Sequence, residues 1–203
     1  MTRERTVCVV DDDPDVRDSL AVLLARRYRV QAFESARALL DAGIQARDTC
    51  VLADVRMPEM DGLALQREIN RTIPGLPVII MTGHGDVPMA VQAMKEGAVE
   101  FLEKPFERAA LLGALENAFA HAALATAAAV GTAAVDAAAR RALTGREQDV
   151  FDLLVEGHQN KVIAHKLGIS ARTVEVHRAR VMDKLGARSL ADLVRLSLGR
   201  GAK

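Results

Sequence analysis

Acidic, hydroxyl and amine side chains follow short apolar runs in the first half of the 203-residue chain. Three consecutive aspartates, residues 11–13, follow the first run, and Asp54 lies near the end of the third. Thr82 and Lys104 follow the fourth and fifth runs. Crowded carboxylates attract a hard cation such as Mg²⁺, and a carboxylate can attack phosphorus to form an aspartyl phosphate. The metal, the ammonium and the hydroxyl would then stabilise the charge of the transferred group.

The apolar runs have the length and composition of β-strands, and the segments between them have helical spacing. Alternating strands and helices predict an α/β fold, a doubly wound five-stranded parallel sheet with helices on both faces. The carboxyl ends of parallel strands meet at one edge, so we expect the four groups to share one cleft. The predicted strands are Thr6–Val10, Arg29–Phe33, Val51–Val55, Pro77–Met81 and Val99–Leu102.

Each of these groups also has an ordinary structural interpretation. Three aspartates after a strand are often a polar turn that caps the next helix. Asp54 is more informative, because a carboxylate inside an apolar run needs a compensating partner. The placement of all these groups at successive strand ends favours a functional site.

The chain changes character after residue 121. Residues 122–142 are rich in alanine and contain Gly131, which predicts a linker that is partly helical. One continuous helix through this segment is the alternative. We therefore expect a first domain over residues 1–121, a linker over 122–142 and a second domain over 143–203.

The last domain has helical spacing throughout, which predicts a small all-α fold. Thr144 and Glu147 fit a capping box, a pattern that starts a helix. Further helices are predicted near 160–167, after Ser170, and at about 190–198. Residues 141–203 hold 12 basic and 7 acidic side chains, whereas the first 140 residues hold 15 and 20. A basic second domain indicates a polyanionic partner.

Composition excludes several classes of protein. The chain has two cysteines, Cys8 and Cys50, too few for a disulfide framework, and we expect both to be buried and inert. No apolar run is long enough to span a membrane, and the first residues lack a secretory signal. We therefore expect a cytoplasmic protein with no membrane partner.

The first 120 residues resemble the receiver domains of bacterial two-component response regulators. The resemblance is carried by residues 9–13, 54–58, 82–83 and 104–105, which occur in the family's order. It implies a sensor histidine kinase as phosphodonor and a cis peptide before Pro105. By this resemblance the phosphoacceptor is Asp54; Mg²⁺ is bound by Asp11, Asp12, Asp54 and the carbonyl of Arg56; and Thr82, Lys104 and Phe101 act in phosphoryl contact and switching.

The second domain resembles the LuxR-type helix-turn-helix, in the segments 143–147, 160–164 and 170–178. Such a domain places a recognition helix in the major groove of promoter DNA. The resemblance points to base edges for Glu175, Val176 and Ala179. Basic and polar residues nearby are predicted to contact phosphates: Asn160, Lys161, Arg172, Thr173, Arg178, Arg180 and Lys184.

Two further runs, 82–91 and 172–179, resemble the FixJ subgroup of the NarL/FixJ family. This resemblance implies a transcriptional activator that works with RNA polymerase and forms a homodimer when phosphorylated. Some members of the subgroup answer to a haem-based oxygen-sensing kinase, whereas others serve aromatic catabolism. The protein would not be an enzyme beyond its own phosphoryl transfer and slow dephosphorylation.

Three other classes of protein share parts of this pattern. A phosphatase of the haloacid dehalogenase type carries its nucleophile in an Asp-x-Asp motif after the first strand, whereas Asp54 lies on the third. A LuxR-type sensor of small molecules has no reason to assemble the acidic set. A phosphate-independent regulator with a vestigial receiver is the alternative closest to the leading interpretation.

Overall fold

The computed structural model describes residues 5–83, 87–127, 143–187 and 189–198. Strands and helices alternate through the first half, and only helices follow. The strands are β1 (Thr6–Val10), β2 (Arg29–Phe33), β3 (Thr49–Asp54), β4 (Val78–Thr82) and β5 (Glu100–Glu103). The helices are α1 (Pro14–Leu24), α2 (Ala36–Asp41), α3 (Gly62–Thr72), α4 (Val87–Lys95), α5 (Arg108–Ala127), α7 (Gly145–Val155), α8 (Asn160–Leu167), α9 (Ala171–Leu185) and α10 (Leu190–Leu198).

These elements fall into two compact units. The first contains the sheet with α1, α2, α3 and α5, and the second contains α7 to α10, with which α4 is grouped. Helix α5 continues to Ala127, so the predicted linker begins as helix. The rest of that predicted linker, residues 128–142, lies outside the described residues, and the predicted domain bounds stay predictions.

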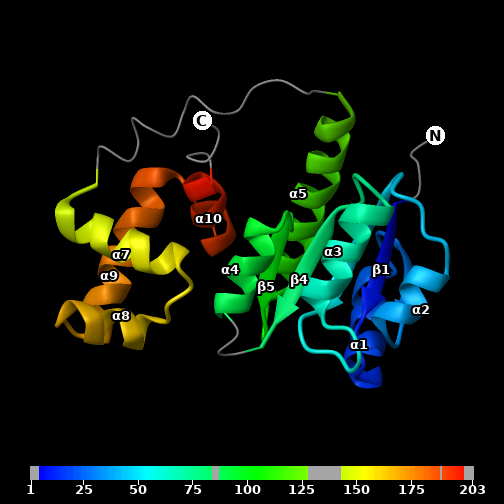
Figure 1. Ribbon diagram of the computed structural model, residues 1–203, viewed down its shortest axis with the longest axis horizontal. Helices are drawn as coiled ribbons and strands as arrows, with labels where there is room; N and C mark the ends of the chain where they lie inside the picture. Colours follow the sequence, from blue (N-terminus) through cyan, green and yellow to red (C-terminus); the bar gives the residue numbers. More distant parts are fainter. Residues whose placement is uncertain (1–4, 84–86, 128–142, 188, 199–203) are drawn as a thin grey trace. The chain divides into compact units, whose positions relative to one another are not determined.

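The five strands form one parallel sheet in the order β2-β1-β3-β4-β5 (Figure 1). Strands β1 and β2 begin and end where the sequence predicted. The others are displaced by one or two residues. The order reverses between β1 and β3, where Val7 pairs with Cys50. Ligands of doubly wound sheets bind at such a reversal, and the predicted fold class is confirmed.

One face of the sheet is covered by α1 and α5. Strand residues such as Val9 and Leu52 pack there against Leu24 and Leu115 in one apolar cluster. Side chains alternate along a strand, so Val51 and Ala53 point to the other face, where α2 and α3 contact each other. The sequence did not predict α2, a helix of six residues.

Both cysteines are buried within the sheet. Cys8 and Cys50 alternate onto opposite faces, because Cys50 is paired with Val7 rather than with Cys8. Burial raises the pKa of the Cys8 thiol to about 11 and that of Cys50 further. Their predicted burial is confirmed, and their inertness toward thiol reagents stays a prediction.

In the second unit, the helices α7 to α10 pack around a core of their own. Thr144 and Glu147 form the predicted capping box at the start of α7. Helix α8 ends at Gly168 in the left-handed conformation, and Ser170 caps α9 by accepting the backbone N–H of Thr173. The sequence signals for these three helices are therefore confirmed. The core consists of buried side chains that include Val150, Phe151, Leu154, Ile163, Val174, Val181, Leu193 and Val194.

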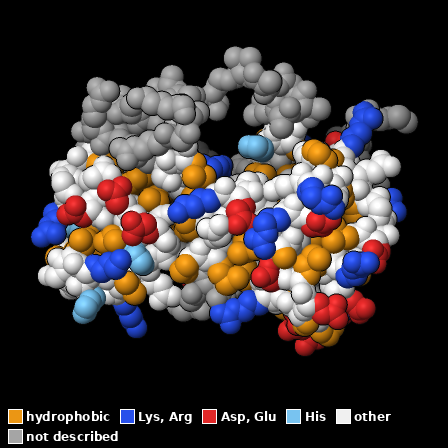
Figure 2. Space-filling model, viewed as in Figure 1, with side chains coloured by type: hydrophobic (Ala, Val, Ile, Leu, Met, Phe, Trp, Pro, Cys, Tyr) orange, Lys and Arg blue, Asp and Glu red, His pale blue; other side chains and the backbone are white. Residues whose placement is uncertain are grey.

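No helix among the described residues is both long and apolar enough to cross a membrane. Acidic side chains gather on the first unit around the start of α1, as Figure 2 shows. Asp12, Asp13, Asp15 and Asp18 are exposed there. The sheet edge that carries the predicted site is therefore strongly negative.

Candidate functional site: a strand-end carboxylate cluster and a helix-turn-helix surface

Three of the predicted groups meet at the carboxyl end of the sheet. Asp11 directly follows β1, Asp54 is the last residue of β3, and Lys104 follows β5. Strands β1 and β3 are hydrogen-bonded neighbours. The Lys104 ammonium lies 2.8 Å from Asp11 Oδ2 and 2.5 Å from Asp54 Oδ1. One cation therefore bridges two carboxylates that are 43 residues apart in the chain.

Burial determines the electrostatics of this cluster. The side chain of Asp54 is 12% exposed and that of Asp11 is 3% exposed. Burial raises the pKa of Asp54 above its usual range, although hydrogen bonds from Lys104 and from the backbone of Arg56 oppose the shift. For Lys104, burial alone would lower the pKa, but hydrogen bonds to Asp11 and Asp54 raise it instead. Two acids share one ammonium, so the cluster retains negative charge.

The loop after β3 holds the second oxygen of Asp54. The backbone N–H of Arg56 donates to Asp54 Oδ2 at 2.7 Å. The loop is closed by the N–H of Gly62, which donates to the Val55 carbonyl at 3.0 Å. A Cβ on Gly62 would overlap the backbone carbonyl oxygen of Asp54 and would lie 3.0 Å from the Val55 Cα. Gly62 is a positioning residue that sequence reasoning missed, because only the folded loop shows that a side chain at this position would have no room.

The loop after β1 is organised by hydrogen bonds around Asp11. Asp11 Oδ1 accepts the backbone N–H of Asp13 at 3.0 Å. Asp13 in turn caps α1 by accepting the N–H of Asp15 at 2.9 Å. The guanidinium of Arg17, which the sequence analysis also missed, donates to the Asp11 carbonyl at 2.7 Å. Asp12 is exposed beside them, so the three aspartates have three different environments.

The predicted switch pair is Thr82 and Phe101, and among the described residues no side-chain hydrogen bond joins Thr82 to the carboxylates of the cluster. Thr82 is fully buried, and its hydroxyl donates to the Gly83 carbonyl at 3.3 Å. The backbone N–H of Lys104 donates to the Thr82 carbonyl at 2.7 Å, which joins the two strand ends. Phe101 on β5 is 9% exposed. The Lys104–Pro105 peptide is cis, as predicted.

The donor atoms of the cluster fit a magnesium ion. Within the described residues, no three acidic, histidine or cysteine side chains are grouped closely enough to hold a metal by themselves. The oxygens of Asp11 and Asp54 nevertheless lie within reach of a single atom, the Lys104 nitrogen. Mg²⁺ needs only one or two carboxylates and takes its other ligands from carbonyls, water and phosphate. Asp12 and the Arg56 carbonyl are near in sequence and could complete the set.

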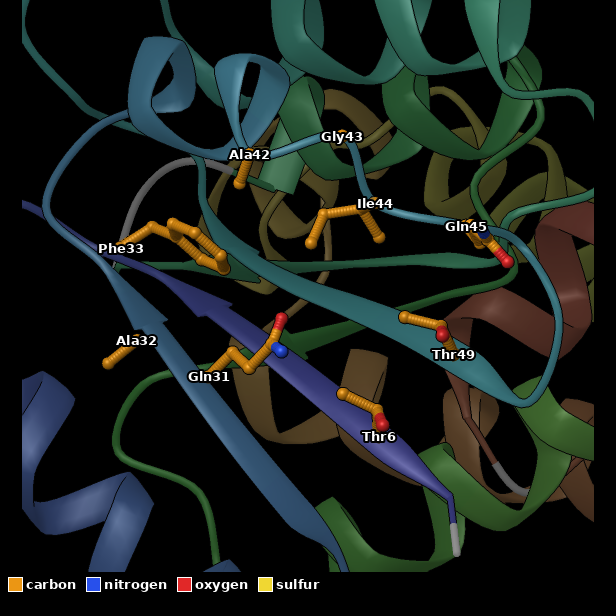
Figure 3. Close-up of a pocket in the computed structure, with 9 residues that line it drawn as sticks. All are labelled: Thr6, Gln31, Ala32, Phe33, Ala42, Gly43, Ile44, Gln45 and Thr49. Atoms are coloured by element: carbon orange, nitrogen blue, oxygen red, sulfur yellow. The ribbon is translucent and has the colours of Figure 1, made fainter. Parts of the chain in front are cut away.

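A pocket elsewhere in the first unit does not coincide with this cluster. It has a volume of about 520 Å³ and lies beside β1, β2 and the loop after α2 (Figure 3). Gln31 and Phe33 from β2 face Ile44 and Gln45 from that loop. None of the residues predicted for the site lines this pocket.

The second unit presents the predicted recognition helix, α9, on its surface. Glu175, Val176 and Ala179, the three residues predicted to face bases, are all exposed. Exposure of an apolar side chain such as Val176, at 42%, suits contact with a thymine methyl group. The buried Val174 and Val181 lie on the opposite side of the helix and anchor it to the core.

The predicted phosphate contacts differ in their surroundings. Lys161, Arg172 and Arg180 are exposed, whereas Asn160, Thr173 and Arg178 are half-buried. The Arg172 guanidinium lies 3.3 Å from Glu175 on the next turn of α9. The backbone and hydroxyl of Thr173 both bond to Ser170, at 3.0 and 2.8 Å. Lys184 is different, because its ammonium lies 2.7 Å from the carboxylate of Glu147 on α7.

Comparison with protein families matches both units. Residues 7–116 match the family described as the response regulator receiver domain. Residues 141–197 match the bacterial regulatory proteins of the luxR family. Together these two matches cover most of the chain.

Individual relatives match nearly the whole chain. It is 47% identical to the transcriptional regulatory protein FixJ of Bradyrhizobium diazoefficiens, covering 99% of this chain and 98% of that protein. It is 44% identical to the C4-dicarboxylate transport transcriptional regulatory protein DctR of Rhodobacter capsulatus, covering 95% and 98%. Among solved structures, full-length FixJ from B. japonicum is 46% identical with a TM-score of 0.58, covering 98% of both chains.

Proposed function

The chain belongs to the response regulators of the FixJ type, with a receiver domain and a LuxR-family DNA-binding domain, and on that premise we propose that phosphorylation of Asp54 controls its binding to promoter DNA. Membership implies a histidine kinase as partner and a role in transcription rather than as a typical enzyme. The observation that carries the proposal is that two carboxylates, Asp11 and Asp54, share the single positive charge of Lys104.

Phosphoryl transfer requires a nucleophile that is ionised and held in place. A carboxylate oxygen of Asp54 attacks the phosphorus of a phosphohistidine; the new O–P bond forms as the P–N bond breaks. The imidazole leaves with the electron pair of the P–N bond and takes up a proton. Hydrogen bonds from Lys104 and from the Arg56 backbone orient the carboxylate for this attack.

The charge of the incoming phosphoryl group is the second requirement. The Lys104 ammonium would turn from Asp54 toward a phosphoryl oxygen and stabilise its charge. Bound Mg²⁺, held by Asp11, Asp12, Asp54 and the Arg56 carbonyl, would supply further neutralisation of the phosphoryl oxygens. Slow loss of the phosphoryl group to water would then reset the regulator.

The signal must then leave the site. We assign this step to Thr82, whose hydroxyl now donates only to the adjacent Gly83 carbonyl and would turn toward the phosphoryl group. The ring of Phe101 is already buried in the described structure, so it would move less than the Thr82 hydroxyl on phosphorylation. The phosphorylated state would form a homodimer and activate transcription with RNA polymerase. Oxygen sensing through haem, where it occurs, would belong to the kinase.

The test couples the two units in one experiment. DNA binding and sedimentation are measured for wild type and Asp54→Asn, with and without beryllofluoride and Mg²⁺. We expect the phosphoryl mimic to drive dimerisation and tighter binding in wild type only. Asp18→Asn, a change at an exposed aspartate on α1, is the matched control and should respond like wild type. No response in wild type would favour the alternative, a phosphate-independent regulator with a vestigial receiver.

A further inference from the structure

A carboxylate with little exposure lies at the start of the second unit. Glu147 occupies the third position of α7, and its side chain is 4% exposed. One of its oxygens, Oε2, accepts the backbone N–H of Thr144 at 2.7 Å and the ammonium of Lys184 at 2.7 Å. The Thr144 hydroxyl accepts the Glu147 N–H at 3.4 Å and completes the capping box. The acid is therefore neutralised by one cation and one backbone dipole.

The cation comes from the far end of the recognition helix. Lys184 lies in the last turn of α9, two residues before Gly186, whose left-handed conformation ends the helix. Helices α7 and α9 pack against each other (Figure 1), and buried Val150 and Val181 belong to the same core. The ion pair therefore joins the first turn of α7 to the last turn of α9.

Helix geometry separates Lys184 from the three residues predicted to face bases. Successive residues are about 100° apart around an α-helix, which places Lys184 beside the half-buried His177 at the margin of the core. Val176 and Ala179 lie on another side of the helix, which is exposed. Lys184 also balances the charge of a buried carboxylate, and a buried charge that loses its partner is strongly unfavourable.

We propose that Lys184 is a positioning residue for DNA binding, which acts through Glu147 to fix the orientation of α9 and does not contact phosphate. This inference goes beyond the proposed phosphorylation switch and rests only on the DNA-binding role of the second unit. It replaces the phosphate contact that the sequence analysis predicted for Lys184. A recognition helix held at only one end can tilt, and its exposed side chains then reach the bases less well.

The two roles predict different salt dependence of DNA binding. A phosphate contact releases counterions, so its loss lowers the slope of log affinity against log salt concentration by roughly 0.9. Loss of a positioning residue weakens binding at every salt concentration and leaves that slope unchanged. Lys161, exposed at the start of α8, is the comparator, because Lys161→Ala should flatten the slope.

The decisive variant is Glu147→Gln in the full chain. Glutamine retains the capping box but removes the charge that holds Lys184. If Lys184 positions α9, this change weakens binding about tenfold. If Lys184 contacts phosphate, the change frees the ammonium and leaves binding unchanged or tighter. The two interpretations therefore predict different affinities for this variant.

The experiment uses a DNA fragment selected from a random pool by the wild-type chain, whose binding is established first. Affinity is measured at several salt concentrations for Lys184→Met, Glu147→Gln, the double variant and Lys184→Arg. We expect the two single variants to lose equal affinity with an unchanged slope, the double variant to lose no more, and Lys184→Arg to recover most of the loss. Circular dichroism verifies folding at the assay temperature.

Unchanged or tighter binding by Glu147→Gln would overturn the proposal, and so would either of two further outcomes. One is a slope for Lys184→Met that falls as it does for Lys161→Ala. The other is an additive loss in the double variant, which would mean that Lys184 and Glu147 act separately. If Lys184→Met does not fold, Glu147→Gln and Lys184→Arg still distinguish the two roles of Lys184, because the first variant retains the cap and the second retains the charge.

Discussion

In each of the two units a lysine contacts a buried acid, but the pKa of that acid shifts in opposite directions. In the first unit Lys104 serves both Asp11 and Asp54, and burial raises the pKa of Asp54 in spite of the bridge. In the second unit the Lys184 ammonium lies 2.7 Å from the carboxylate of Glu147. There the lysine and the Thr144 backbone outweigh burial and lower the pKa of Glu147 to about 2.

The difference lies in how completely each acid is neutralised. Two carboxylates for one ammonium leave negative charge, which a metal ion or the electrophilic phosphorus of an incoming phosphoryl group can use. One oxygen of Glu147 instead accepts both an ammonium and a backbone N–H. We infer that the first bridge belongs to a reactive site and the second to the framework of the DNA-binding unit.

Removal of the ammonium that Asp11 and Asp54 share should have the largest effect on the function of the first unit. In Lys104→Met the two carboxylates of the first unit lose their only cation found among the described residues. We expect phosphorylation of Asp54 by acetyl phosphate to slow about 100-fold or more, as for the loss of one charge-stabilising donor. Phosphate-affinity electrophoresis measures the rate. Lys95→Met, at an exposed lysine on α4, should retain the wild-type rate; an equal loss there would mean that Lys104 has no special role.

Crowding the phosphoacceptor loop should have the next largest effect. Gly62→Ala places a methyl group against the backbone of Asp54 and Val55. Overpacking of this kind costs about 1–3 kcal/mol of unfolding free energy, and we expect phosphorylation to slow about tenfold as Asp54 shifts. Urea unfolding and the acetyl phosphate assay measure the two effects.

Gly113→Ala is the matched control for that substitution. Gly113 lies inside α5, and a Cβ there meets no atom within 4 Å. Alanine in a helix interior should stabilise the protein by about 0.5–1 kcal/mol without changing the phosphorylation rate. A similar destabilisation by both changes would mean that the β3–α3 loop does not depend on the missing side chain.

The smallest effect should be a pH dependence of the stability that Glu147 contributes to the second unit. The pKa of Glu147 falls from its ordinary 4.5 to about 2 on folding, so its ionised form stabilises the folded state fully above pH 4.5. That contribution is lost as the pH falls toward 2. Wild type should therefore exceed Glu147→Gln in stability at pH 7, and the gap should shrink across this window. A gap that stays constant in urea unfolding between pH 5 and pH 2.5 would contradict the ion-pair assignment.

Much of the reactive site could be predicted because its parts are local in the sequence. An acid after a buried strand needs no knowledge of distant residues, and parallel strands bring their carboxyl ends to one edge. Asp11, Asp54 and Lys104 were therefore identified together and do meet. Thr144 and Ser170 were equally predictable, since a cap and its helix are a few residues apart.

Other roles depend on contacts between distant residues. The pattern around Gly62 looks like an ordinary helix start, and only the packed loop shows that its hydrogen faces the Asp54 backbone. Arg17 reads as one more basic residue on a helix, although it donates to the Asp11 carbonyl. The helix α2 was missed because six residues carry too little periodicity to be recognised.

The sequence by itself determined the alternation of elements, the sheet edge that carries the acids and the helix predicted to face DNA, because strand and helix periodicities are local properties of the chain. The tertiary structure alone decided that Lys184 neutralises Glu147. Lys104 follows a strand and was expected beside the acids of the other strand ends, whereas nothing in the sequence indicated that Lys184 pairs with an acid 37 residues away. A pairing between two helices depends on how the helices pack, and folding brings Glu147 to Lys184 as it brings Asp11 and Asp54 to Lys104.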